Sequence, residues 1–192
     1  MNQLINDLNY LYENGFDPRN ADYETRKQRL TKAIALMGVN CPDEIIHQMC
    51  IMPASRKYHG NYEGGLLEHS INTVAALCSL TDALDLKWEN DRSPILVGLF
   101  HDLCKTDLYE FTEDGIVYAE NAAPGHGEKS VEIAKSFTPD LTEEEELCIR
   151  WHMGAFDEQE NWPQYNAAIA KYPNVLFTHT ADMVASQIFE KE

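Results

Sequence analysis

Basic residues are scarce in this 192-residue chain, which has 15 lysines and arginines against 32 aspartates and glutamates. The formal charge of -17 repels both the phosphate backbone of a nucleic acid and the headgroups of an anionic membrane. We therefore expect no long nucleic-acid strand and no membrane among the partners of this protein.

Long apolar runs and paired cysteines are also missing. No apolar stretch approaches the roughly 18 residues that a membrane span requires, and MNQLINDLNYLYENG has no basic region of the kind that begins a secretion signal. The five cysteines are an odd number without a CxxC spacing, which is typical of reduced thiols. These absences favour a cytoplasmic protein and leave its oligomeric state open.

Most apolar residues recur with a helical period. This period predicts helices at about residues 4–11, 26–37, 42–49, 66–77, 95–100, 127–137, 142–151 and 175–189. The period changes to two on either side of Asp114-Gly115, which predicts a β-hairpin between Asp107 and Asn121. With 44% hydrophobic residues, the chain can bury one sizeable core. We predict an all-α helical bundle with a small β-hairpin insertion.

Six polar side chains interrupt the apolar surfaces of these helices, and a bundle would bring them together in its core. Imidazole and carboxylate ligands suit Mn, Fe, Co, Ni or Zn, and six of them can hold two ions if one carboxylate bridges. A lone histidine is more often an ordinary hydrogen-bonded residue, but the six together favour a divalent metal site. These candidate ligands are His69, His101, Asp102, His126, His152 and Asp182.

The same residues lie in motifs that resemble the HD-domain metal-dependent phosphohydrolases, whose pattern is H…HD…D. EGGLLEHSINTVAAL contains His69, LFHDLCK contains His101 and Asp102, and HTADMVAS contains Asp182. The resemblance covers about residues 53–190. It implies an HD domain over residues 53–192, with residues 1–52 forming N-terminal helices that pack on the same compact core.

Within that family the sequence is most similar to the HD domain of bacterial 3′→5′ exoribonucleases. In these enzymes GH and HHG motifs supply two further histidines, which GHGEKS and WHMG match with His126 and His152. Met153 departs from the second histidine of HHG, and Cys104 stands where a glycine is usual. No nucleic-acid-binding domain is expected ahead of the HD domain.

The resemblance implies a role for each residue. His69, His101, Asp102 and Asp182 would bind one metal, and His126 and His152 would bind a second, with Asp102 as the bridge and the centre of catalysis. Lys105 would assist catalysis as a positive charge on a phosphate oxygen. His59 and Arg56, on the loop before the predicted helix 66–77, are candidates for substrate binding. His179 is expected to orient Asp182. For Lys105 and His179, ordinary surface and core roles remain open.

These features predict a metal-dependent phosphohydrolase or phosphodiesterase that acts on a nucleotide or a short oligonucleotide. Two alternatives remain open at this point. The same ligands could hold two irons that activate O₂, as in some proteins of this fold, or the chain could be a nucleotide-binding regulator without catalysis.

Overall fold

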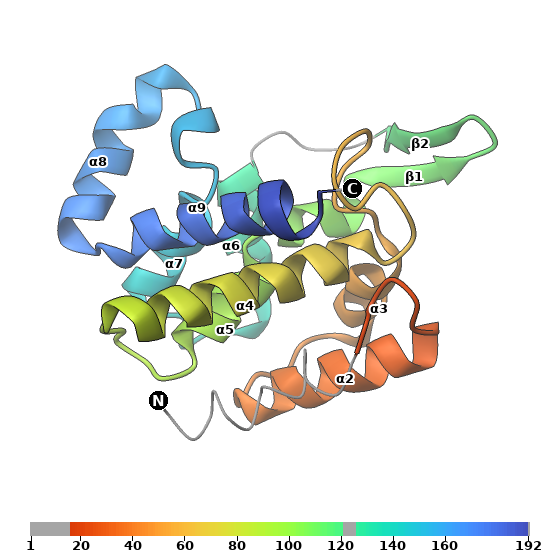
Figure 1. Cartoon of the computed structure of the whole chain (residues 1–192), viewed down its shortest axis with the longest axis horizontal. Coiled ribbons are helices and arrows are strands. Elements are labelled where there is room, and N and C mark those ends of the chain that lie inside the picture. Colours follow the sequence, from red (N-terminus) through yellow and green to blue (C-terminus); the bar gives the residue numbers. More distant parts are fainter. Residues whose placement is uncertain (1–15, 121–125, 192) are drawn as a thin grey trace.

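The computed structural model describes residues 16–120 and 126–191, and it is mainly helical, as predicted (Figure 1). A two-stranded antiparallel sheet pairs Tyr109 with Tyr118 and confirms the predicted hairpin. The α-helices and strands are α2 (Tyr23–Leu36), α3 (Asp43–Ile51), α4 (Gly65–Leu84), α5 (Ser93–Phe100), β1 (Tyr109–Thr112), β2 (Gly115–Tyr118), α6 (His126–Phe137), α7 (Glu143–Arg150), α8 (Trp162–Lys171) and α9 (Asn174–Val184).

Helix α4 lies at the centre of the molecule, with α5 on one side of it and α9 above it in Figure 1. Its residues Leu67, Ile71, Val74 and Leu77 are buried, and every residue of α5 is buried as well. Side chains of α2 and α3 join the same hydrophobic core. None of the helices in the described ranges is both long and apolar enough to cross a lipid bilayer.

Local signals fix where several helices begin. The Asp22 carboxylate accepts a hydrogen bond from the Thr25 amide at 2.7 Å and caps α2. Thr142 and Glu145 form a capping box at the start of α7, because each side chain accepts a bond from the backbone amide of the other residue. Glu145 also accepts a bond from the Ser93 hydroxyl at 2.9 Å, which ties the start of α7 to the start of α5.

Three parts of the helical prediction differ from the structure or lie outside it. Helix α8 was not predicted, although Trp162, Tyr165 and Ala168 recur at helical spacing after a polar loop. The predicted helix 175–189 is α-helical only to Val184, and a π-helical turn, Ala185–Phe189, follows it. The predicted helix 4–11 lies outside the described residues.

Candidate metal centre and pocket

Five of the six predicted ligands lie together on the buried side of four helices. His69 comes from α4, His101 and Asp102 follow the end of α5, His152 follows α7, and Asp182 lies on α9. The Nε2 atom of His69 is 3.1 Å from Nε2 of His101 and 3.1 Å from Oδ1 of Asp182. These three residues present ligand atoms within 4.8 Å of one another.

The Asp102 carboxylate divides this cluster into two sides. Its Oδ2 atom lies 3.3 Å from His101 Nε2 and 3.5 Å from His69 Nε2. Its Oδ1 atom faces the other way and lies 3.4 Å from His152 Nε2. The Lys105 ammonium, on the 3-10 helix that continues from Asp102, is 2.5 Å from Oδ2. The two oxygens of one carboxylate therefore lie near different histidines.

Backbone carbonyls fix the rings of two of these histidines. The Nδ1 atom of His101 is 2.9 Å from the Gly98 carbonyl, and Nδ1 of His152 is 2.8 Å from the Ile149 carbonyl. A carbonyl can only accept, so Nδ1 carries the proton and Nε2 presents its lone pair to the cluster. This is the tautomer that a metal-binding histidine needs.

A carboxylate takes the place of the carbonyl at His69. The π-helical turn after α9 brings Glu190 to 3.1 Å from His69 Nδ1, and Asn72 donates a second hydrogen bond to Glu190 at 3.0 Å. The sequence analysis did not identify Glu190. Glu190 lies just beyond the end of the predicted helix 175–189, and the π-helical turn that directs it toward His69 has no signal in the sequence.

Neighbouring charges shift the pKa values of the acidic and basic groups in the cluster in opposite directions. Burial alone raises the pKa of Asp102, but the neighbouring Lys105 and His101 lower it well below its usual range. Burial lowers the pKa of His69, yet Asp182 and Glu190 outweigh it and raise this pKa to about 10. The negative field that favours a proton on His69 favours a metal cation at the same place.

The structure places His126 and His179 at the margin of the cluster. His126 begins α6, and its Nδ1 atom lies 3.5 Å from the Cys104 sulfur. His179 is 2.7 Å from the backbone carbonyl of His152, so it supports the segment that carries His152, whereas the sequence suggested Asp182 as its partner. Gly154 faces the same ring, which a Cβ at that position would approach to 2.5 Å.

The two substrate-binding candidates on the loop before α4 have different surroundings. The ring of His59 packs 4.6 Å from the ring of His69, and its buried Nε2 atom has no hydrogen-bond partner within residues 16–120 and 126–191. Burial, with His69 and Lys105 nearby, lowers the pKa of His59 to about 4. Arg56 instead stacks over Tyr118 of the hairpin at 5.1 Å, outside the set of residues that line the pocket described next.

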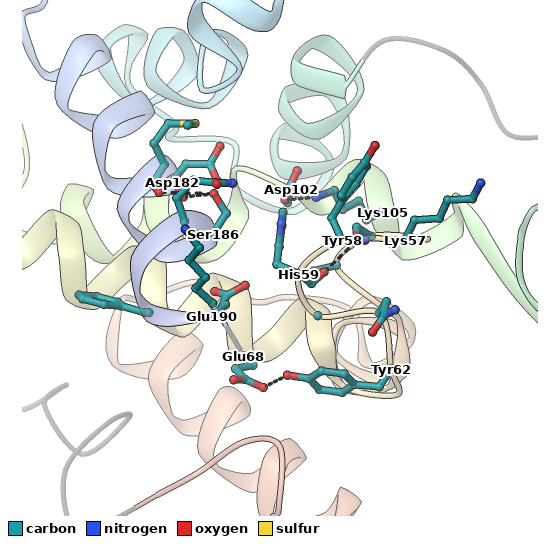
Figure 2. A pocket seen from close by; sticks show the side chains of 18 of the residues that line it. Lys57, Tyr58, His59, Tyr62, Glu68, Asp102, Lys105, Asp182, Ser186 and Glu190 are labelled. Atoms are coloured by element: carbon teal, nitrogen blue, oxygen red, sulfur yellow. Dashed lines mark hydrogen bonds and ion pairs between the residues drawn. The ribbon is translucent and has the colours of Figure 1, made fainter.

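A pocket of about 900 Å³ opens over the cluster. In Figure 2 the loop residues Lys57, Tyr58 and His59 lie on one side of it and Asp182, Ser186 and Glu190 on the other, with Asp102 and Lys105 between them. Met153, His126 and both hairpin tyrosines also line this pocket. A ligand that enters it therefore meets the Asp102 and Lys105 side chains.

Hydrogen bonding within the cluster, apart from any sequence motif, also indicates that its side chains suit a metal ion. Asp102 Oδ1 and His152 Nε2 are both buried and lack a hydrogen-bond partner among the described residues. Unsatisfied buried polar atoms are rare in native proteins, and an ion between donors of this kind would satisfy them. All the donors are imidazole nitrogens or carboxylate oxygens, which suit a borderline or hard divalent ion.

Comparison with known proteins gives one partial relative. The chain is 39% identical over 66 residues to a dihydroneopterin 2',3'-cyclic phosphate phosphodiesterase of Methanocaldococcus jannaschii. The matched segment is 33% of this chain and 26% of that enzyme, so the likeness spans about a quarter of the relative's length. No protein-family model matches the chain, and no solved structure matches it significantly.

Proposed function

We propose that the protein is a metal-dependent phosphohydrolase or phosphodiesterase of the HD type, acting on a nucleotide or a short oligonucleotide. The observation that carries this proposal is the position of Asp102, a buried carboxylate whose two oxygens face different histidines at the floor of an open pocket. Such a carboxylate is what a site for two cations needs as its bridge.

The partial relative supports the same chemistry. It is a phosphodiesterase by name, and the name describes a cyclic phosphate that is attached to a ring-bearing molecule. The H…HD…D motifs resemble hydrolases that cleave phosphate esters, and they contain four of the five clustered residues, His69, His101, Asp102 and Asp182; His152 comes from the WHMG motif. Resemblance and geometry therefore support one reaction class, the attack of water on phosphorus.

Each residue has a role in this proposal. His69, His101, Asp182 and Oδ2 of Asp102 would hold one ion, and His152, Oδ1 of Asp102 and His126 a second. Bound divalent ions would polarise the phosphoryl group as Lewis acids. They would also lower the pKa of a bound water molecule to near neutrality.

The protein's own contribution includes a cation at the pocket floor. Burial lowers the pKa of Lys105, but Asp102 outweighs it and raises this pKa above the usual value, so its ammonium stays charged. That charge lies beside Asp102, where the ammonium can donate a hydrogen bond to a phosphoryl oxygen that becomes more negative during the reaction.

Elemental analysis of anaerobically purified protein, combined with a nucleotide and phosphodiester substrate panel, tests the proposal. We expect about two equivalents of Mn, Fe, Co, Ni or Zn, and phosphate-ester cleavage that a chelator abolishes and the metal restores. Fe-dependent O₂ uptake without ester cleavage would instead identify a di-iron oxygenase. Bound nucleotide with no turnover under any metal would identify a regulator.

Two variants test the division of ligands. Asp102→Ala should abolish cleavage and lose both metals, because no neutral side chain replaces a bridging carboxylate. His126→Ala should lose about one equivalent and leave the ion at His69, His101 and Asp182 in place. If folded Asp102→Ala retains two equivalents, Asp102 is not a bridge, and if His126→Ala retains two, His126 is not a ligand.

A further inference from the structure

The pocket is larger than the ion cluster requires, and aromatic side chains line the part that the reaction chemistry does not use. Tyr58, Phe156 and Phe189 reach it from three separate segments, and all three are exposed. Ligand pockets are commonly lined by hydrophobic and aromatic side chains, with a few polar groups that orient the ligand.

Tyr58 is held in place by its own loop. The Ser55 hydroxyl accepts a hydrogen bond from the Tyr58 amide at 2.8 Å and donates one to the His59 carbonyl at 2.8 Å. The Ala54 amide closes the loop with a bond to the Gly60 carbonyl at 2.8 Å. The backbone that carries Tyr58 is therefore fixed before any ligand arrives, which lowers the entropy lost on binding.

The ring of Tyr58 is more accessible to a ligand than that of Tyr118, which also lines the pocket. Tyr118 already packs against Arg56 and against Tyr109, whose ring centre is 5.5 Å away. Tyr58, by contrast, is 82% exposed. Figure 2 shows it on the side of the pocket opposite Asp182 and Glu190.

The neighbouring charges indicate what such a ligand carries. Lys57 and Lys105 line the same pocket as Tyr58, in a chain whose overall charge is strongly negative. A flat ring against Tyr58 and a phosphate near Lys105 would thus fit one small molecule. Aromatic side chains bind the bases of nucleic acids by such stacking, whatever the base.

We propose that Tyr58 stacks on the planar heteroaromatic ring of the substrate, a ring-bearing phosphate ester whose phosphate lies at Asp102 and Lys105. This proposal rests on the proposed function, and it adds a specificity-determining residue and a substrate class. The ring belongs either to a nucleotide base or to a pterin, since both present the same flat, heteroatom-rich face.

The test measures binding without turnover. Phosphonate analogues of GMP, of a pterin phosphate and of ribose 5-phosphate have a P–C bond that cannot be hydrolysed, and calorimetry on the metal-loaded protein gives their Kd values. We expect the wild type to bind at least one ring-bearing analogue at least about fivefold more tightly than the ribose analogue, the lower limit for one stacked base.

Variants assign that preference to Tyr58. Tyr58→Ala should lose the ring preference, Tyr58→Phe should keep it, and both should bind the ribose analogue as the wild type does. Phe111→Ala is the matched control, because it removes an aromatic ring that is also exposed but is not among the residues that line the pocket.

The outcomes separate this inference from the proposed function. Equal affinity of the wild type for ring-bearing and ribose analogues, or an unchanged preference in Tyr58→Ala, overturns the role of Tyr58 even if phosphate esters are cleaved. Failure of every analogue to bind, together with no cleavage of any ester, overturns the proposed function itself. The tighter of the GMP and pterin analogues identifies the source of the ring.

Discussion

Glu190 distinguishes His69 from the other two buried histidines. His101 and His152 direct Nδ1 at a backbone carbonyl, whereas His69 directs it at a carboxylate that Asn72 also holds. A carboxylate behind a histidine fixes the tautomer and increases the electron density on the opposite nitrogen. Glu190 thus serves as a positioning residue for His69, although it lies 121 residues away in the sequence.

Glu190→Gln should weaken metal binding about ten- to hundredfold, as is typical when a residue that supports a metal ligand is changed. Competition with a metallochromic chelator measures this affinity without relying on activity. Glu68→Gln is the control, because Glu68 lines the same pocket but bonds to Tyr62 instead of a histidine. An equal loss in both variants would show that pocket charge, and not the orientation of His69, sets the affinity.

At the scale of elements, Asp157 holds together the irregular segment after α7. Its carboxylate accepts bonds from Arg150 at 2.7 Å, from the Asn161 side chain at 2.9 Å and from the Glu158 amide at 2.7 Å. Burial raises the pKa of Asp157, but these bonds outweigh it and lower the pKa on balance. The ionised form therefore stabilises the fold.

Asp157→Asn should lower the free energy of unfolding by about 1 kcal/mol at pH 7, a discounted value for a partly exposed charge-assisted bond. Because the folded-state pKa is lowered, this stabilisation is present above the unfolded pKa of about 3.9 and is lost as pH falls through the folded value. Urea unfolding between pH 7 and pH 3.5 measures it. A difference between variant and wild type that does not shrink toward acid pH would contradict the assignment.

Gly127 determines how closely α6 approaches α7. A Cβ at this position would lie 1.9 Å from the Arg150 carbonyl oxygen, a backbone atom that cannot rotate away. The contact lies between His126 and the segment that carries His152, so it sets the spacing of two predicted ligands.

Gly127→Ala should destabilise the fold by about 1 to 3 kcal/mol, as overpacking does, and should reduce the bound metal at the His126 and His152 side. Thermal unfolding and elemental analysis measure the two effects. Ser136→Ala on the exposed part of α6 should stay within about 0.5 kcal/mol of the wild type. A Gly127→Ala protein with wild-type stability would mean that α6 has room to move.

At the scale of the whole molecule, charge sets the expected size of the substrate. The pocket has a few basic side chains, including Lys57 and Lys105, against a net charge of -17. Several phosphates of a long strand would need a continuous basic groove, and their binding would weaken steeply with salt.

We expect Mn-loaded protein to have a higher kcat/KM for a dinucleotide than for a 30-mer at near-physiological salt, with distributive action on the 30-mer. Product lengths over time distinguish distributive from processive cleavage. Processive degradation of the 30-mer at the higher efficiency would show that local pocket contacts outweigh the overall charge.

Much of the fold follows from local patterns that the sequence displays. Helix α4, the hairpin with its Asp-Gly turn and the Thr142–Glu145 capping box were all predictable, because each depends on residues a few positions apart. Helix α8 was not predicted from the sequence, because its apolar residues recur over only ten positions. The π-helical turn at 185–189 was not predicted either, because this departure from α-helical geometry depends on packing with distant segments.

The sequence by itself determined which residue types are available as ligands and that each sits beside a helix. Only the tertiary structure decided which of them meet. It brought five of them into contact: His69, His101, Asp102, His152 and Asp182. His126 lies at the margin of this cluster, and Arg56 stacks on Tyr118 of the hairpin. It also placed Glu190 beside His69 and Tyr58 in the lining of the pocket. The reason is physical: contacts between distant segments depend on how helices cross and where their turns end, which no local period encodes.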